Sequence, residues 1–252
     1  MIQKPLITII LPFFNSEKYL KFSVNSVVKQ TFKHWKLILI DDASTDDSLK
    51  ICLEYKEKLK NKVTLILNKK NMGQAYCRNK GIAICKTKYL AFLDSDDFWH
   101  QNKLKMQINF MRKKKIKFSF SNYIVLSKKK KKIFLEKKIN YQTFLTNSSI
   151  PTSSIILDKS IIKNIRFPNK IRICEDYYFK SKILMKHSAY NINKFLLFYQ
   201  IREHSLQSNR IKALTTIFLI NKRFNNLNIF QNLNSIFRIS LNSIKKFGLF
   251  RD

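Results

Sequence analysis

The sequence predicts an α/β fold in which helices flank a mostly parallel sheet. Short apolar runs of strand length alternate with segments of helical spacing over the first 100 residues. These runs are continuously apolar, as expected for strands buried on both faces of a parallel sheet. Clusters of aspartate follow two of the runs, at the position where open parallel sheets bind ligands. The 45% hydrophobic content of the 252 residues supplies a core and excludes a wholly disordered chain.

Strand and helix alternate in the first half of the chain. The first strand is predicted at residues 6–11, because Pro12 ends the apolar run, and a helical pattern follows Ser16. The later elements are a strand at 35–40, a helix at 46–59, a strand at 63–67, a helix at 74–85 and a strand at 89–93. This order is typical of βαβ units, whose strands are parallel.

The second half has a less regular pattern. Its expected elements are a hairpin of 116–126 and 132–136 with a basic tip, a strand at 153–157, a helix at 175–186, a strand at 195–201 and a basic helical region from about residue 211. We therefore expect one domain over residues 1–205, divided into the halves 1–100 and 101–205, and a basic helical C-terminal segment over 206–252.

The chain carries 49 Lys and Arg against 16 Asp and Glu, which gives a net charge of +33. A preference for A- and T-rich codons explains this excess as well as a surface that binds phosphate does. If the charge is functional, the partner is a nucleic acid, an anionic membrane leaflet or an acidic sugar polymer. The three glycines exclude both a P-loop and a glycine-rich dinucleotide fingerprint.

Cysteine usage and hydropathy indicate the compartment. The four cysteines form no C-x-x-C pair, which predicts buried thiols in a reducing environment. No window approaches the roughly 18 to 20 apolar residues of a membrane span. We expect a cytoplasmic protein, either soluble or peripheral on the inner face of the cell membrane.

Seven of the ten aspartates lie in two clusters, each directly after an apolar run. Asp94, Asp96 and Asp97 follow the strand at 89–93, where carboxylates can share Mg²⁺ or Mn²⁺ with a substrate diphosphate. The alternative is a polar turn in which Asp96 or Asp97 caps the next helix. The second cluster, after the strand at 35–40, makes the metal site the favoured interpretation.

The second acidic cluster and the helix after the third strand supply further candidates. Asp42 can accept a hydrogen bond from a nucleotide base or a ribose hydroxyl. Asp46 and Asp47 instead suit the start of the next helix. Gly73 allows a sharp turn before the third helix. Arg78 on that helix faces either solvent, as an ordinary exposed arginine does, or an anionic ligand.

Five ordered motifs in the first 100 residues carry a family resemblance. They are 9–20 (IILPFFNSEKYL), Ser26 to Gln30-Thr31-Phe32, 41–46 (DDASTD), the spaced set Asn71, Gly73, Arg78, Asn79 and Gly81, and 92–97 (FLDSDD). Together they resemble the family 2 glycosyltransferases, which have the GT-A fold and use nucleotide-diphosphate sugars. Residues 151–154 (PTSS) and 174–178 (CEDYY) look like the acceptor-side strand and the E-D catalytic motif of bacterial members. The resemblance fades after about residue 205.

The resemblance implies a role for each candidate residue. In the nucleotide-sugar half, Pro12, Phe14 and Asp42 would surround the base, Arg78 would lie near the same pocket, Asp94 near the ribose, and Asp96 or Asp97 on the metal. In the acceptor half, Asp176 would be the general base, and Glu175 would orient the site or simply start the helix. His204 would reach the diphosphate or the metal, or be an ordinary surface or packing residue.

From this resemblance we expect an inverting, metal-dependent transferase. It would move a sugar from a nucleotide-diphosphate sugar to a glycan or lipid-linked acceptor, in bacterial surface polysaccharide or lipopolysaccharide assembly. The alternative is a basic nucleic-acid-binding protein without catalysis, which predicts steeply salt-dependent binding. We expect no nucleic acid partner, because the candidate site residues are carboxylates, which repel phosphate unless a cation intervenes.

The basic C-terminal segment suits an anionic membrane surface, where a lipid-linked acceptor would lie. Its apolar and basic residues are interleaved as in an interfacial amphipathic helix. They are Phe218, Leu219, Phe224, Phe230, Phe237 and Phe247 with Lys222, Arg223, Arg238, Lys245 and Lys246. The apolar side chains could equally pack on the core.

Overall fold

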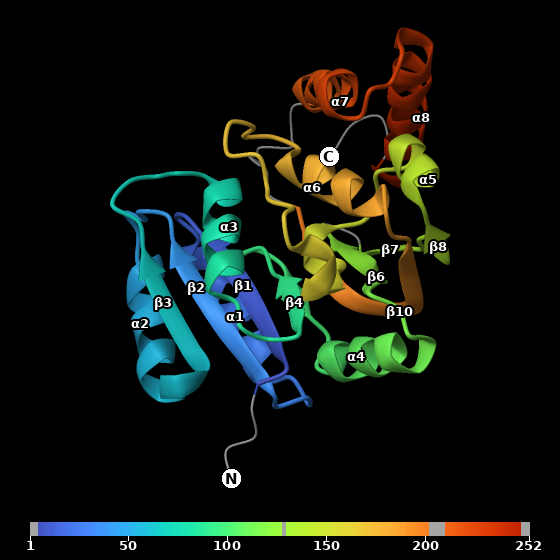
Figure 1. Cartoon of the computed structure of the whole chain (residues 1–252). Helices are drawn as coiled ribbons and strands as arrows, with labels where there is room; N and C mark the ends of the chain where they lie inside the picture. Colours follow the sequence, from blue (N-terminus) through green and yellow to red (C-terminus); the bar gives the residue numbers. More distant parts are fainter. Residues whose placement is uncertain (1–4, 128–129, 202–209, 248–252) are drawn as a thin grey trace.

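The computed structural model of the chain describes residues 5–127, 130–201 and 210–247 (Figure 1). Within them ten strands form one sheet with helices on both faces. Eight strands follow the order β3-β2-β1-β4-β9-β6-β10-β5, while β7 pairs with β6 and β8 pairs with β10. The predicted α/β fold is confirmed, with a sheet that is parallel in the first half and mixed in the second.

The parallel half is built around β1. The strand β1 (Ile7–Phe13) lies between β2 (Trp35–Asp41) and β4 (Tyr89–Phe92), and β3 (Val63–Leu67) pairs with β2. Every residue of β1 is buried, because alternate side chains enter separate cores on the two faces. One core contains residues of α1 (Glu17–Val28) and α2 (Ser48–Leu59), and the other contains residues of α3 (Gln74–Ile84).

The second half combines parallel and antiparallel pairs. The strand β6 (Phe118–Leu126) runs parallel to β10 (Ala189–Gln200), whereas β9 (Ile156–Asp158) is antiparallel to both β4 and β6. Three short strands, β5 (Phe98–Trp99), β7 (Lys131–Ile133) and β8 (Lys138–Ile139), are antiparallel to their neighbours. The helices of this half are α4 (Lys103–Lys114), α5 (Tyr141–Thr146) and α6 (Glu175–Leu184).

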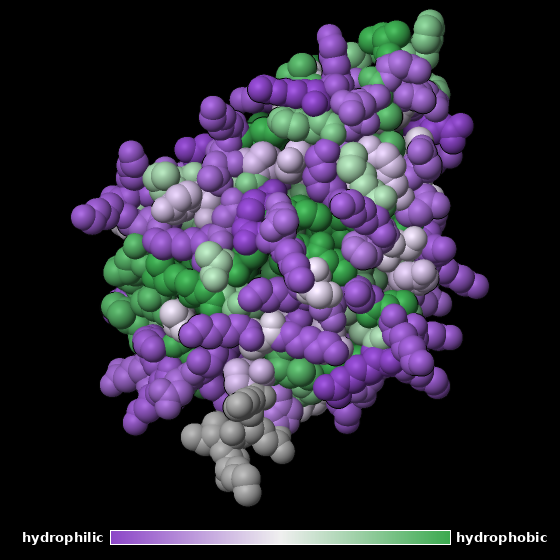
Figure 2. Space-filling view, viewed as in Figure 1, coloured by the Kyte–Doolittle hydropathy of each residue, from purple (hydrophilic) through white to green (hydrophobic). Residues whose placement is uncertain are grey.

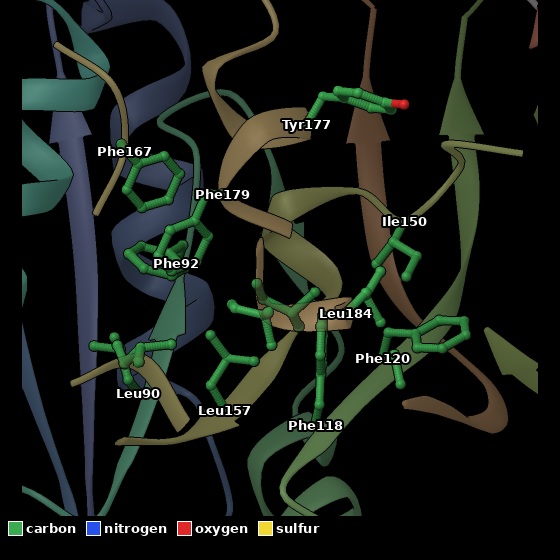
Figure 3. Close-up of a cluster of buried hydrophobic side chains, with 14 of the residues drawn as sticks. Leu90, Phe92, Phe118, Phe120, Ile150, Leu157, Phe167, Tyr177, Phe179 and Leu184 are labelled. Atoms are coloured by element: carbon green, nitrogen blue, oxygen red, sulfur yellow. The ribbon is translucent and has the colours of Figure 1, made fainter. Parts of the chain in front are cut away.

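Packed aromatic rings fix α6 against the sheet (Figure 3). Phe167 stacks on Phe179 with ring centroids 4.0 Å apart, and Phe92 of β4 meets both rings edge to face. Aromatic pairs in these geometries stabilise beyond the area that they bury. Because Phe179 lies on α6, this packing also positions the first turn of α6, which begins with two acidic residues.

The C-terminal segment forms two helices. α7 (Arg210–Phe224) and α8 (Ile229–Phe247) pack against each other and against α6 and α5 at one end of the molecule (Figure 1). The helical prediction for 206–252 is therefore confirmed in its described part, while the predicted domain boundaries stay predictions. Among the described residues, no helix combines the length and the apolar character that crossing a bilayer requires.

Several elements differ from the sequence prediction. The patterns missed α4, α5, β5 and β8, and the strand expected at 153–157 is a 3₁₀ turn (Thr152–Ser154) followed by β9. Two further 3₁₀ turns are Lys60–Lys62 and Lys159–Ile162. Two- and three-residue strands are too short to show a period in the sequence. Three of the cysteines are buried thiols as expected, and Cys174 is half-buried.

Candidate active site

The carboxyl ends of β1, β2 and β4 meet at one edge of the sheet, because these strands are parallel. Pro12 is buried near the end of β1, opposite Ile40 of β2, and Phe14 follows the strand with 43% of its surface exposed. Asp42 directly follows β2, and Asp94 follows β4. The structure therefore brings these four predicted site residues to the same edge, while their contacts with a nucleotide stay predictions.

Asp42 holds the segment that leads into α3. Its Oδ1 accepts hydrogen bonds from the Asn68 side chain and the Met72 amide, both at 2.8 Å, and its Oδ2 accepts from the Gly73 amide at 2.7 Å. Gly73 has a φ of +89°, a backbone conformation that residues with a Cβ rarely adopt, so the position favours glycine. Protein groups thus occupy both oxygens of Asp42. Sequence reasoning missed this anchoring role.

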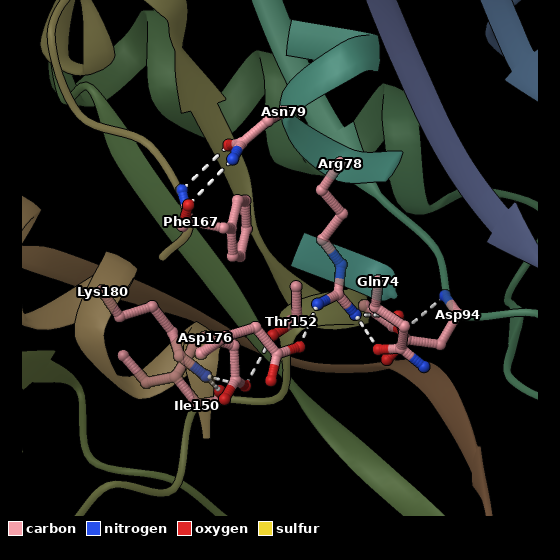
Figure 4. Close-up of polar contacts among 11 residues, drawn as sticks. Gln74, Arg78, Asn79, Asp94, Ile150, Thr152, Phe167, Asp176 and Lys180 are labelled. Carbon is pink, nitrogen blue, oxygen red and sulfur yellow. Dashed lines mark hydrogen bonds and ion pairs between the residues drawn. The ribbon is translucent and has the colours of Figure 1, made fainter. Parts of the chain in front are cut away.

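Arg78 is only 2% exposed, so the alternative of an ordinary exposed arginine is wrong. Its Nη2 donates to Asp94 Oδ1 at 2.6 Å and to the Gln74 side chain at 2.9 Å, and its Nη1 donates to Glu175 Oε1 at 2.7 Å (Figure 4). The guanidinium carbon lies 5.3 Å from the centre of the Phe167 ring. Three elements, α3, the end of β4 and the start of α6, therefore meet at one buried cation.

Glu175 begins α6 and contacts Arg78, while a role in orienting the site stays a prediction. It is the first residue of α6, where a carboxylate suits the helix dipole, and it also accepts the hydrogen bond from Arg78. Burial raises the pKa of Glu175, the Arg78 guanidinium opposes this effect, and the neighbouring Asp176 carboxylate adds to it. The contact of Glu175 with the other candidate residues therefore runs through Arg78.

The acidic segment after β4 does not cap a helix. It continues into β5, and α4 begins only at Lys103, with Asn102 as its N-terminal cap residue. The alternative in which Asp96 or Asp97 caps the next helix is therefore wrong. The segment is held instead by Ser23 of α1, whose hydroxyl donates to the Asp97 carbonyl at 2.6 Å.

Asp97 has the features of a cation ligand. It is 1% exposed, and its Oδ1 accepts from the Gln200 amide at 3.1 Å, whereas its Oδ2 has no hydrogen-bond partner among the described residues. Burial raises the pKa of Asp97 well above its ordinary value and the Asp96 and Asp94 carboxylates raise it further, while the Ser153 hydroxyl and the Gln200 backbone amide oppose this rise. A divalent cation would satisfy the unpaired oxygen and offset this repulsion, so the residues fit Mg²⁺ or Mn²⁺.

A complete metal cage is absent from the described part of the chain, where no three His, Cys, Asp or Glu residues are grouped to hold an ion. Mg²⁺ is commonly bound by one or two carboxylates, while water and substrate phosphates fill its other positions. A partial donor set is therefore compatible with a site that the substrate completes. His204, the remaining predicted ligand, lies outside the described residues.

Asp176 is paired with a lysine of its own helix. Its Oδ2 accepts hydrogen bonds from the Thr152 hydroxyl at 2.8 Å and from the Lys180 ammonium at 2.7 Å (Figure 4). Lys180 is itself buried and also donates to the Ile150 carbonyl at 2.7 Å. Burial raises the pKa of Asp176, but Lys180 and Arg78 outweigh this effect and hold the pKa at about 2. The carboxylate is therefore ionised at neutral pH.

Sequence reasoning missed both partners of Asp176. Lys180 lies four residues later on the same helix, a spacing that places opposite charges side by side, so this pair carried a readable signal. Thr152 lay within the motif at 151–154, but no local pattern links it to a residue 24 positions away.

A cavity of about 450 Å³ opens beside Asp94 and Asp176. Its walls come from the loop 147–152, from Tyr123 and Tyr199 on neighbouring strands, from α6, and from the facing sides of α7 and α8. The two C-terminal helices contribute Ile211, Leu214, Ile217, Ile239 and Ile244, together with Arg210 and Lys246. The C-terminal helices thus line the cavity beside Asp94 and Asp176, although the sequence placed them in a separate segment.

Comparison with known proteins identifies the family. The model of the family described as "Glycosyl transferase family 2" matches residues 8–184, from β1 to the end of α6. The chain belongs to this family. The resemblance found in the first 100 residues is therefore confirmed, and this family member is a glycosyltransferase.

Two bacterial members of the family are similar over most of their length. TuaG of Bacillus subtilis (strain 168), which is named for teichuronic acid biosynthesis, is 31% identical over 248 residues, covering 96% of this chain and 98% of TuaG. WfgD of Escherichia coli is named UDP-Glc:alpha-D-GlcNAc-diphosphoundecaprenol beta-1,3-glucosyltransferase. It is 34% identical over 213 residues, covering 83% of this chain and 82% of WfgD.

Solved structures confirm the GT-A fold. S. aureus TarS 1–349 in complex with UDP-GlcNAc matches with a TM-score of 0.72 at 19% identity, over 95% of this chain and 73% of that chain. The mannosyltransferase PcManGT from Pyrobaculum calidifontis, in complex with GDP-Man and Mn²⁺, matches with a TM-score of 0.71 at 11% identity, over 96% and 74%. At these identities the likeness shows the fold alone.

Proposed function

We propose that this enzyme transfers a sugar, with inversion, from a nucleotide-diphosphate sugar to a hydroxyl of a glycan or lipid-linked acceptor in bacterial surface polysaccharide or lipopolysaccharide assembly. One observation carries the proposal: Arg78 joins Asp94 at the strand edge to Glu175, and the adjacent Asp176 opens into the same cavity as Asp94. The names of WfgD and of the TarS complex, which cite UDP-sugars, support the donor class.

The strand edge is the proposed donor site. Asp94 accepts from the ribose while Arg78 holds its carboxylate in place, and the exposed Phe14 ring contacts the base beside Pro12. Asp96 and Asp97 would hold Mg²⁺ or Mn²⁺. The bound cation would neutralise the charge that develops on a departing diphosphate. The Mn²⁺ named in the PcManGT complex supports this assignment.

Asp176 is the proposed general base. Its ionised state leaves it ready to take a proton from an acceptor hydroxyl as that oxygen attacks the anomeric carbon. Thr152 and Lys180 both contact Oδ2, so we assign proton acceptance to Oδ1. Attack from the Asp176 side, opposite the leaving diphosphate, inverts the anomeric centre. A carboxylate with a pKa of about 2 is a weak base, so it takes the proton as the acceptor oxygen bonds to the anomeric carbon and becomes more acidic.

The cavity beside Asp176 is the proposed acceptor site. Its isoleucine and leucine side chains from α7 and α8 suit an apolar group, and Arg210 and Lys246 supply positive charge for phosphate. WfgD is named for a diphosphoundecaprenol-linked acceptor, which has both features. We place the enzyme in the cytoplasm, at the inner face of the membrane where such an acceptor would lie. The carboxylates of the site also support the expectation of no nucleic acid partner.

A transfer assay tests the function. The protein is incubated with a panel of UDP-, GDP- and dTDP-sugars, Mn²⁺ and short polyprenyl-diphosphate-linked sugars, and product is followed by mass spectrometry. We expect transfer with at least one donor, and loss of transfer in Asp176→Asn. The proposal would be contradicted if the protein bound none of the sugar nucleotides and released no sugar in a reaction that depends on Asp96 or Asp97.

A further inference from the structure

The hairpin of α7 and α8 uses one face to bind the rest of the protein. Asn221 of α7 accepts a hydrogen bond from the Tyr177 hydroxyl of α6 at 2.8 Å and donates to Asn232 of α8 at 3.2 Å and Ser235 at 3.1 Å. Ser235 in turn donates to the Leu145 carbonyl of α5. A buried, satisfied polar network of this kind fixes one orientation of the hairpin. The inner faces of both helices therefore pack against the rest of the protein.

The outer face of α8 carries an apolar stripe. Phe230, Leu233, Phe237 and Leu241 follow each other at intervals of three, four and four residues, which places them along one side of the helix. Each of these side chains is between 41% and 81% exposed. Figure 2 shows apolar side chains at the end of the molecule where Figure 1 places α7 and α8. Exposed apolar surface in such a continuous array marks an interaction site.

The charge around this stripe has one sign. Residues 210–247 contain seven Lys and Arg and no Asp or Glu. Exposed lysines of the β6–β7 hairpin lie beside the end of α8, since Lys131 Nζ donates to the Lys246 carbonyl at 2.6 Å. The partner of this face therefore carries negative charge. A second copy of the chain would bring like charges, among them Arg238 and Lys245, against each other, which disfavours a dimer through this face.

We propose that the outer face of α8 docks the protein on an anionic lipid bilayer. Phenylalanine and leucine side chains enter the boundary between headgroups and acyl chains, and the flanking Arg238 and Lys245 contact lipid phosphates. This chemistry satisfies the apolar stripe and the positive charge together. The sequence left open whether the apolar residues of this segment pack on the core, and the structure assigns Phe230 and Phe237 to the outer face.

Docking would place the acceptor cavity at the membrane surface. The inner sides of α7 and α8 line the cavity that holds Asp176, while the outer side of α8 contacts lipid. A lipid-linked sugar could then reach Asp176 without leaving the bilayer. This last step rests on the proposed function, whereas the binding to lipid does not.

Vesicle flotation without substrate tests the inference on the full-length chain. Vesicles of phosphatidylcholine that contain about 30% phosphatidylglycerol have a negatively charged surface. They are compared with vesicles of pure phosphatidylcholine. We expect binding to the anionic vesicles that weakens with added salt. Phe230→Ser with Phe237→Ser should weaken it by at least about 30-fold, from the loss of two inserted rings. Arg238→Gln and Lys245→Gln should each weaken it about fivefold.

A matched control is Phe22→Ser, because Phe22 is 66% exposed on α1, which packs on the opposite face of the sheet. Its vesicle binding should equal that of the wild type, and all variants should keep the wild-type melting temperature. Asp176→Asn should also float normally, so loss of transfer and loss of docking are distinguished. Three results would overturn the inference: no flotation of the wild type, normal flotation of the double phenylalanine variant, or a dimer in light scattering that this variant dissociates.

Discussion

The proposed donor side and the proposed acceptor side hold their carboxylates by different means. At the strand edge, Asp42 and Asp97 accept hydrogen bonds from backbone amides, which the course of the chain places there. On the acceptor side, Asp176 is held by two side chains, the Thr152 hydroxyl and the Lys180 ammonium. Its charge state is therefore set by residues that can be replaced without changing the sheet.

Because of this difference, substitutions on the two sides should impair the enzyme in different ways. Changes at the strand edge should cost folding or donor binding, because these residues also tie the loops and strands together. Changes around Asp176 should cost the chemical step and leave donor binding intact. Arg78 spans both sides, since it pairs with Asp94 and Glu175, so its loss should affect the whole site.

The largest effect is expected from Asp176→Asn. Removing the general base should lower kcat by about 10² to 10⁴-fold, while the asparagine oxygen still accepts from Thr152 and Lys180. The donor dissociation constant should stay at the wild-type value. Steady-state kinetics together with nucleotide titration measure both quantities. Asp47→Asn, an exposed aspartate before α2, is the matched control. A loss of donor binding equal to the loss of kcat would remove the distinction between the two sides.

Arg78→Met should destabilise the fold. The substitution leaves Asp94 and Glu175 without their buried cation, and breaking a buried ion pair from one side costs about 3–5 kcal/mol. The unfolding midpoint in urea should fall accordingly, whereas Arg112→Met, at an exposed position on α4, should leave it unchanged. Equal midpoints for the two variants would show that the guanidinium does not connect the two sides.

Lys180→Met should change the pH dependence of the reaction. Without the ammonium, burial raises the Asp176 pKa from about 2 by about 1–3 units. The base must be ionised, so the acid limb of kcat/KM should move to higher pH by the same amount. Lys186→Met, an exposed lysine two residues after α6, should leave the profile unchanged. An unmoved acid limb in Lys180→Met would contradict the assignment of Asp176 as the base.

The same pair makes a small contribution to stability with a defined sign. The folded-state pKa of Asp176 lies below its ordinary value of 3.8, so the pairing stabilises the fold above about pH 4 and is lost as pH falls toward 2. Acid unfolding of Lys180→Met should therefore lack part of the wild-type dependence in this window. Identical acid-unfolding curves would argue against the ion pair.

The smallest effect is expected from Phe14→Ala. A ring stacked on a base contributes about 1–3 kcal/mol, so the donor KM should rise at least about fivefold with little change in kcat. Because Phe14 is half exposed, the melting temperature should not change. Phe22→Ala provides the comparison, since that exposed ring lies on α1. An unchanged donor KM in Phe14→Ala would show that the Phe14 ring does not bind the nucleotide base.

The sequence predicted which residues share the strand edge, because parallel strands bring the residues that follow them to the same edge of the sheet. Apolar runs located β1 to β4, and the residues after each run had to meet at one edge. The acceptor side depended on contacts that no local pattern records. Arg78 and Glu175 are 97 positions apart, so the burial of Arg78 could not be read from its helix. The contribution of α7 and α8 to the cavity was hidden for the same reason.

The most direct test of the account is Mn²⁺-dependent nucleotide binding to Asp97→Asn, measured by titration calorimetry beside Asp176→Asn. Asp97 is buried next to two other carboxylates, and both burial and these neighbours raise its pKa, so the neutral variant should keep or raise the melting temperature. It should nevertheless bind nucleotide with Mn²⁺ at least about tenfold more weakly, while Asp176→Asn binds like the wild type. Full binding by Asp97→Asn would contradict a cation held at the strand edge.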